Sequence, residues 1–188
     1  MSRTLIVALV AASMAGIATT PDARADEATP EAGTALPRRD LPSVFFVSKN
    51  ENKNEVHYGL HLDAKCRPVG KAPLFAYWRM KEKGPAVTEP LLTRELAGYG
   101  LGAQRVESRE DASLVTFTVR ALPERPILLE VKEIDGTCSA TPWIVIGEGT
   151  AHLANIHVNV SWPFGIGSVV LRGTKKGDGT NVSETIAK

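Results

Sequence analysis

The sequence predicts a mainly β domain, an antiparallel sandwich or barrel of about eight or nine short strands with one short helix. Three observations support this fold class. Short runs that alternate apolar and polar residues recur along the chain. Turn-forming Gly, Pro, Asn and Asp separate these runs at intervals of about eight to twelve residues. A helical spacing of apolar residues occurs in one segment alone.

The first three strands are expected at 44–48, 55–63 and 74–80. The run 44–48 is rich in β-forming residues and is followed by a polar turn. The segment 55–63 alternates, so that one face carries Val56, Tyr58, Leu60 and Leu62. The segment 74–80 is rich in aromatic residues and is expected to be buried on both faces.

The helix is expected between residues 88 and 98. Thr88 suits the capping position, and Pro90 suits the first turn. Leu92 and Leu96 stand four residues apart, and Gly98 is a typical end signal.

The second half of the chain predicts further strands at 104–108, 114–121, 127–134, 137–146, 154–162 and 168–172. Asp135 and Gly136 are typical of a type I′ hairpin turn between two of them. Pro142 predicts an edge position or an interruption in its strand. The strand at 154–162 has the clearest alternation, with one face formed by Ile156, Val158, Val160 and Trp162.

The N-terminal segment 1–25 is predicted to be a secretory signal peptide. Arg3 precedes an uncharged, apolar run that is too short to cross a bilayer. Ala23-Arg24-Ala25 then forms a small-x-small cleavage signal, which places the mature start at Asp26, so cleavage falls between Ala25 and Asp26. Residues 26–40 predict a disordered leader, 41–173 a single β-rich domain and 174–188 a loose C-terminal tail.

Charge and cysteine content restrict the partners and the compartment. Removal of residues 1–25 leaves 20 basic and 20 acidic residues, a balance that argues against a nucleic-acid partner. The mature chain is expected to have no transmembrane segment and to be a monomer. Cys66 and Cys138 are the two cysteines, and export to an oxidising compartment predicts that they form a disulfide. The alternative is that Cys66 is a free, reactive thiol.

A series of short motifs carries a family resemblance. In order, these motifs are the Asn-rich turn before Val56-His57-Tyr58, the pair Tyr77-Trp78, the pair Tyr99-Gly100, and Gly173 with Gly179 near the end. Over roughly residues 43–184 the chain resembles a bacterial family of exported β-rich proteins, the domain of unknown function 4833 (DUF4833) family. The resemblance implies a single exported domain and assigns no catalytic residues. The two cysteines are not part of it.

Candidate sites are few. His57 and His61 share one strand face but lie about 13 Å apart, too far to bind one ion together. A zinc site that combines either of them with His157 is an alternative, yet solvent-facing, dispensable histidines explain the same pattern, so we expect no metal and no cofactor. The sequence contains no G-x-S-x-G motif. Tyr77 and Arg79 fall on one strand face and are the candidate ligand-binding residues.

The function predicted from these features is that of an exported, non-catalytic binding or interaction domain of the cell envelope. Its location is expected to be periplasmic or secreted, and its partner an unknown protein or envelope component. The alternative is an exported hydrolase whose acidic and basic groups meet only in the folded chain.

Overall fold

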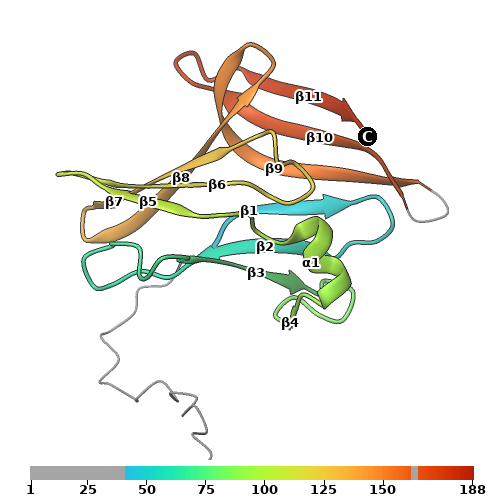
Figure 1. Cartoon of the computed structure of the whole chain (residues 1–188), viewed down its shortest axis with the longest axis horizontal. Coiled ribbons are helices and arrows are strands. Elements are labelled where there is room, and N and C mark those ends of the chain that lie inside the picture. Colours follow the sequence, from blue (N-terminus) through green and yellow to red (C-terminus); the bar gives the residue numbers. More distant parts are fainter. Residues whose placement is uncertain (1–40, 162–164) are drawn as a thin grey trace, which may run out of the picture. The chain divides into compact units, whose positions relative to one another are not determined.

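The computed structural model describes residues 41–161 and 165–188, which belong to one compact unit. Within these residues the chain is mainly β, with eleven strands and one short helix, so the predicted fold class is confirmed (Figure 1). The predicted signal peptide 1–25, its cleavage site between Ala25 and Asp26, and the predicted leader 26–40 lie outside the described residues, as does Trp162.

All eleven strands belong to one sheet, in the order β4-β3-β2-β1-β9-β8-β7-β6-β5, and β10 and β11 continue it from the other edge of β9. The strands are β1 (Leu41–Lys49), β2 (Glu55–Leu60), β3 (Leu74–Arg79), β4 (Thr88–Pro90), β5 (Arg105–Ser108), β6 (Ser113–Phe117), β7 (Ile127–Ile134), β8 (Thr137–Ile146), β9 (Gly149–Ser161), β10 (Gly165–Lys175) and β11 (Asn181–Ala187). In Figure 1, β1 to β4 lie on one side of β9, and the pair β10 and β11 lies on its other side.

The prediction of a purely antiparallel sheet is wrong at one place, because β1 and β9 pair in parallel. The long strand β9 pairs along one edge with β10, and its other edge is shared by β8 at residues 149–152 and by β1 at residues 155–158. Short turns force sequence neighbours to be antiparallel, but β1 and β9 come from opposite ends of the chain and no turn sets their direction.

Pro142 lies where β8 and β9 separate. The ladder between these strands stops at Trp143 with His152, one residue after the proline. A proline has no N–H to donate to a ladder, which suits a strand that is paired on one side only. The predicted edge position of Pro142 is therefore confirmed, although β8 continues through it without interruption.

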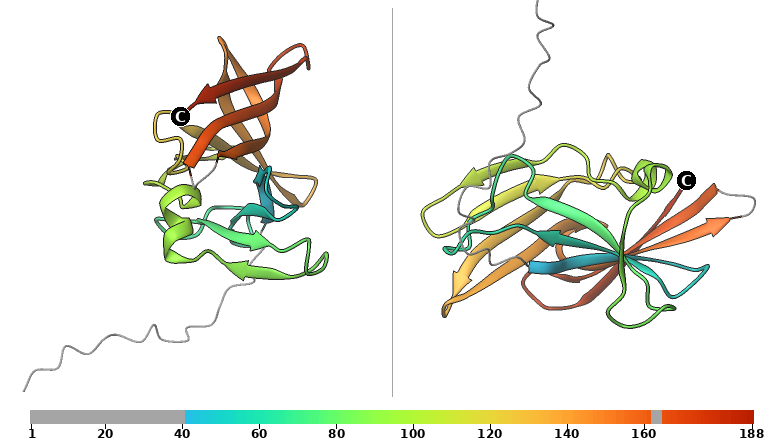
Figure 2. Two further views of the ribbon diagram at one scale, coloured as in Figure 1. Left: turned by 90° about the vertical axis from the view of Figure 1, so that its right-hand side faces the viewer. Right: turned by 90° about the horizontal axis from the view of Figure 1, so that it is seen from below.

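The sheet folds over and encloses its core. Phe45 of β1 stacks on Tyr58 of β2 with ring centroids 4.4 Å apart, and it also lies 5.9 Å from Phe117 of β6, which is not a neighbouring strand. Within the described residues β4, β5 and β11 each pair on one edge alone, so the sheet stays open. Figure 2 shows how its strands twist across one another.

The predicted helix is correct in kind and close to correct at its C-terminal end, but its predicted start is wrong. Residues Thr88–Pro90 form β4 against β3, and helix α1 spans Thr93–Tyr99. The carboxylate of Glu95 accepts a hydrogen bond from the backbone N–H of Leu92 at 2.7 Å, and this contact satisfies a donor at the start of the helix. The start is therefore set by Glu95, three residues after Leu92, rather than by Thr88.

The prediction of a loose tail from residue 174 is also wrong. Residues beyond Lys175 turn back at 176–180 and form β11, which pairs with β10 along its whole length. The carboxylate of Glu184 in β11 accepts hydrogen bonds from Arg125 and from the backbone N–H of Gly147, so the last strand is fixed to other parts of the domain. Val182 and Ile186 are its half-buried apolar residues, a pattern too sparse to predict a strand.

Candidate functional site

Strand β3 separates two candidate regions, because successive side chains of a strand point to opposite faces of the sheet. Trp78 points toward the core side, where it borders a groove. Tyr77 and Arg79, the predicted ligand-binding residues, lie on the outer face.

Tyr77 and Arg79 are both half-buried and bound to their own chain. The hydroxyl of Tyr77 donates to the carbonyl oxygen of Pro42 at 2.8 Å, and its ring stacks on His57 with centroids 5.8 Å apart. Arg79 donates from Nε to the carbonyl oxygen of Pro85 at 3.2 Å. The shared face is as predicted, but neither residue lines the groove beside Trp78.

A chain of hydrogen bonds crosses the outer face through His57. Nδ1 of His57 lies 2.7 Å from Oγ of Ser43, and Nε2 lies 2.9 Å from Oε2 of Glu55. The other oxygen of Glu55 forms an ion pair with Lys81. Glu55 and His57 are two residues apart in β2 and therefore share a face. Ser43 reaches His57 from β1, at a place where the pairing of β1 with β2 is irregular between Leu41 and Phe45.

The expectation of a solvent-facing His57 is wrong, because this residue is only 5% exposed. The ring lies between those of Phe46 and Tyr77 on the two neighbouring strands. Its two ring nitrogens contact Ser43 and Glu55. Nδ1 of His157 lies 2.9 Å from Oγ of Ser48. A zinc site that combines His57 with His157 does not fit these contacts. Within residues 41–161 and 165–188 there is no group of three or more potential metal ligands.

Burial and hydrogen bonding fix the charge states of this network. Burial lowers the pKa of His57, and this effect outweighs the opposing hydrogen bond to Glu55. Burial alone would raise the pKa of Glu55, but hydrogen bonds from Lys81 and His57 lower it below the usual value. At neutral pH the imidazole is therefore neutral and the carboxylate is ionised. A carboxylate can only accept, so the proton of the ring is on Nε2 and Nδ1 accepts from Ser43.

We expect the domain to lose stability as the pH falls from 7.5 to 5.5. The folded state holds His57 neutral while the unfolded chain takes up a proton near pH 6.5, so stability is present above that value and decreases below it. The lowered pKa of Glu55 adds a second loss below about pH 4.5. Thermal melts across this range test the first step. His57→Gln should flatten the loss between pH 7.5 and 5.5, and an unchanged slope in this variant would contradict the assignment.

A groove of about 460 Å³ lies on the other side of β3, between that strand and α1. Its apolar lining consists of Trp78, Met80, Pro90 and Leu92. Nε1 of Trp78 donates to Oε2 of Glu95 at 2.9 Å, the same oxygen that accepts from the start of α1. The indole ring is thereby held in one orientation along the groove.

Apolar side chains beside the groove are exposed to solvent. Every residue of α1 is at least partly exposed. Leu92 is 54% exposed, Leu96 40% and Val87 37%. Leu92 stands at the capping position just before α1 with an extended backbone, and Leu96 lies within the helix, so two exposed leucines stand together at the start of α1. Clustered exposed apolar residues mark interaction surfaces more often than single ones do.

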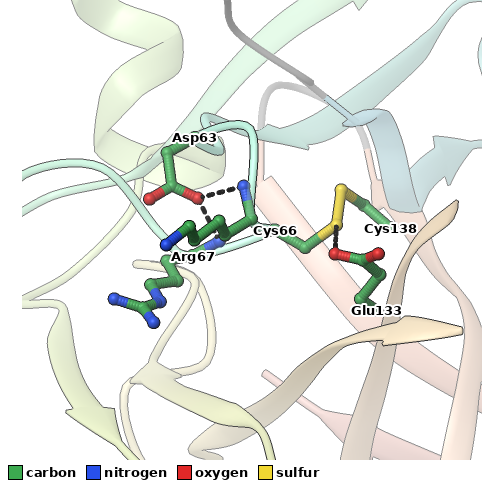
Figure 3. The surroundings of a disulfide bond; sticks show 6 residues. Asp63, Cys66, Arg67, Glu133 and Cys138 are labelled. Atoms are coloured by element: carbon green, nitrogen blue, oxygen red, sulfur yellow. Dashed lines mark hydrogen bonds between the residues drawn. A yellow bond between two sulfur atoms is a disulfide. The ribbon is translucent and has the colours of Figure 1, made fainter. Parts of the chain in front are cut away.

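The disulfide between Cys66 and Cys138 is present, as predicted. It connects the loop after β2 to β8, with a Cα–Cα distance of 5.2 Å (Figure 3). The carboxylate of Glu133 lies 3.9 Å from Sγ of Cys66. A disulfide sulfur carries no proton, so this approach is a contact and not a hydrogen bond. The adjacent hollow of about 490 Å³ is lined by charges of both signs, among them Lys65, Arg67, Arg109, Glu110, Asp111, Lys132 and Glu133.

The comparison with protein families identifies the chain. The model of the family described as Domain of unknown function (DUF4833) matches residues 45–185. The chain belongs to the DUF4833 family. No curated protein and no solved structure matches it. The DUF4833 match covers β1 from Phe45, the groove, most of the His57 network and β11 up to Thr185, but Ser43 lies two residues before it.

The sequence predicted the shared face of Tyr77 and Arg79 and the disulfide, but the residues that the fold gathers around them were missed, and a ligand-binding role for Tyr77 and Arg79 stays a prediction. The Glu55-x-His57 spacing was a usable signal, since alternate residues of a strand share a face. Ser43, Lys81 and Glu95 reach their partners only through the tertiary fold. In the described part of the chain no helix is long and apolar enough to span a membrane.

Proposed function

We propose that this chain is an exported binding domain that docks an amphipathic segment of a partner protein in the groove between β3 and α1. The observation that carries the proposal is the exposure of Leu92 and Leu96 at the start of α1, beside the groove that Trp78 borders. The disulfide is consistent with an oxidising compartment, periplasmic or extracellular.

The charges around the groove favour an apolar ligand over an ionic one. Lys49 pairs with Glu51 and lies 5.2 Å from the centre of the Trp78 ring. Glu89 pairs with Lys83, and Glu95 is bonded to Trp78 and to the backbone of Leu92. Because each of these charges already has a partner, the attraction available to a ligand comes mainly from burial of apolar surface.

The geometry also favours a protein segment over a small molecule. The exposed Leu92 and Leu96 extend the apolar surface beyond the groove of about 460 Å³, and an extended apolar surface suits a protein segment. Tryptophan is among the residues that contribute most to protein interfaces, especially where it is held rigidly in a partly closed site. Trp78 is held rigidly by its bond to Glu95 but is only 7% exposed, so it forms a fixed wall of the groove and the exposed leucines supply most of the contact area.

Site-specific photocrosslinking tests the proposal. A photoreactive phenylalanine analogue at position 96 should give a crosslink to one protein partner in cells that make the chain, and the same group at Ile134, which is 46% exposed on β7, should not. The identified partner is then purified. Leu92→Ser combined with Leu96→Ser should weaken its binding by about tenfold or more in calorimetry.

The control for that measurement is Ile134→Ser, which removes an equally exposed apolar side chain far from α1 in the sheet order. Its affinity should match that of the unchanged protein. A crosslink from position 96 only to the chain itself, or equal affinity for the double variant and the control, would show that the groove is not a docking site.

A further inference from the structure

We propose that Ser43 is an activated nucleophile that accepts acyl groups from esters, with His57 as its general base and Glu55 as the residue that orients the base. This activity goes beyond the binding function and uses residues of β1 and β2 on the face of the sheet opposite the groove. The oxygen of Ser43 lies 2.7 Å from Nδ1 of His57, and Nε2 of the same ring lies 2.9 Å from Glu55. Both distances fall within the reach required of a nucleophile, a base and an orienting group.

The direction of each hydrogen bond supports this assignment. Glu55 is ionised and can only accept, so the imidazole donates from Nε2 and presents a bare Nδ1 to the hydroxyl of Ser43. The hydroxyl has a weaker alternative acceptor in the carbonyl oxygen of Phe45, at 3.5 Å. Lys81 pairs with Glu55 and holds that carboxylate in its charged form.

The exposure of the three residues suits their proposed roles. Ser43 is exposed to solvent, whereas His57 is buried behind it and Glu55 is largely covered. A substrate can therefore reach the nucleophile while the base and the carboxylate remain shielded from water. When the proton moves to His57, an imidazolium forms beside the carboxylate of Glu55. Shielding from water strengthens the attraction between these two charges.

The reaction that this arrangement supports is acyl transfer in two steps. Oγ of Ser43 forms a bond to the carbonyl carbon of the ester, its proton passes to Nδ1 of His57, and the alcohol leaves with that proton. Water then attacks the acyl-serine with His57 again as base, and the products are the carboxylic acid and the free serine. Glu55 stabilises the imidazolium in both steps, as the carboxylate does in serine hydrolases.

The chain contains a matched pair for comparison. Oγ of Ser48 lies 2.9 Å from Nδ1 of His157, a contact like that of Ser43 with His57. Among the described residues no carboxylate is bonded to His157, and Ser48 also accepts from Asn155 at 3.5 Å. If the carboxylate and burial of the histidine create reactivity, Ser43 reacts and Ser48 does not.

Labelling with a fluorophosphonate probe tests the proposal. Ser43 should attack phosphorus and release fluoride, which gives one adduct per chain that peptide mapping places at Ser43. Ser43→Ala should abolish the adduct, and Ser48→Ala should leave its rate unchanged. His57→Gln should slow labelling by about 100-fold. Each variant is first checked for an unchanged melting profile at pH 7.5, and Glu55→Gln serves if His57→Gln does not fold.

A second measurement separates a base from a merely structural histidine. The labelling rate should rise with pH as His57 loses its proton. The charged groups that act on the pKa of His57 are Glu55, Lys81 and Arg79. The groove variant of Leu92 and Leu96 should label at the normal rate, so this test is independent of the docking proposal. Failure to label Ser43, equal labelling of Ser48, or a rate independent of His57 and Glu55 would each overturn the proposal.

Discussion

Replacing Cys66 and Cys138 by serine is expected to lower the melting temperature of the domain by about 10 °C. The two cysteines are 72 positions apart. On the chain-entropy model, a loop of that size restricts the unfolded state by about 4 kcal/mol. That amount is a large part of the roughly 5 to 15 kcal/mol by which domains are stable.

The position of the bridge adds a local effect to this entropic one. Cys66 has a left-handed backbone with φ of 58°, a conformation that is unfavourable for residues other than glycine. Asp63 holds the loop by accepting from the backbone N–H groups of Lys65 and Arg67, both at 2.8 Å. The disulfide then ties this loop to β8, which lies beyond β1 and β9 in the sheet.

Thermal melts of the double serine variant, with and without a reductant, measure the effect. The variant should be insensitive to the reductant, and the unchanged protein should melt at the lower temperature once reduced. Asp63→Ala is the matched control, because it removes the loop contacts but leaves the covalent link and should cost much less. A double variant as stable as the parent, or two free thiols in the denatured, unreduced protein, would contradict the prediction.

Local signals in the sequence predicted the elements that depend on local chemistry. β7 spans Ile127–Ile134 as predicted, because its alternation is strict and its turn is marked. Asp135 and Gly136 have φ of 50° and 75°, as a type I′ turn requires. The buried positions Ile156 and Val158 of β9 were likewise predicted by alternation alone.

The features that sequence could not predict depend on partners far along the chain. The parallel pairing of β1 with β9 joins residues about 110 positions apart, and no turn or spacing records it. Thr88 carries a helix-capping signal, but its pairing with Arg79 in the sheet overrides that preference. The burial of His57 follows from Phe46 and Tyr77 on neighbouring strands, which alternation within β2 cannot reveal.

Tyr58→Ala is expected to destabilise the domain by about 3 to 5 kcal/mol, as for other large aromatic residues removed from a core. Tyr58 is fully buried, and its ring stacks on Phe45 with centroids 4.4 Å apart. Its hydroxyl donates at 2.7 Å to the carbonyl oxygen of Tyr99, which is the last residue of α1. One side chain thus joins the centre of the core to the helix that borders the proposed docking groove.

Tyr58→Phe separates the two roles of this residue. It keeps the ring but leaves the carbonyl of Tyr99 without its donor, at a cost of about 1 to 2 kcal/mol. Relative to the parent, amide hydrogen exchange should then become faster in α1 and stay the same in β7, because the lost bond anchors the end of the helix and β7 is paired on both edges elsewhere in the sheet. Chemical denaturation gives the total loss of stability for both variants. Equal stability of the Phe variant and the parent, with unchanged exchange in α1, would mean that the hydroxyl does not anchor the helix. Its other contacts, the bond between Trp78 and Glu95 and the bond from the N–H of Ala121 to the carbonyl oxygen of Gly98, would then hold α1 in place.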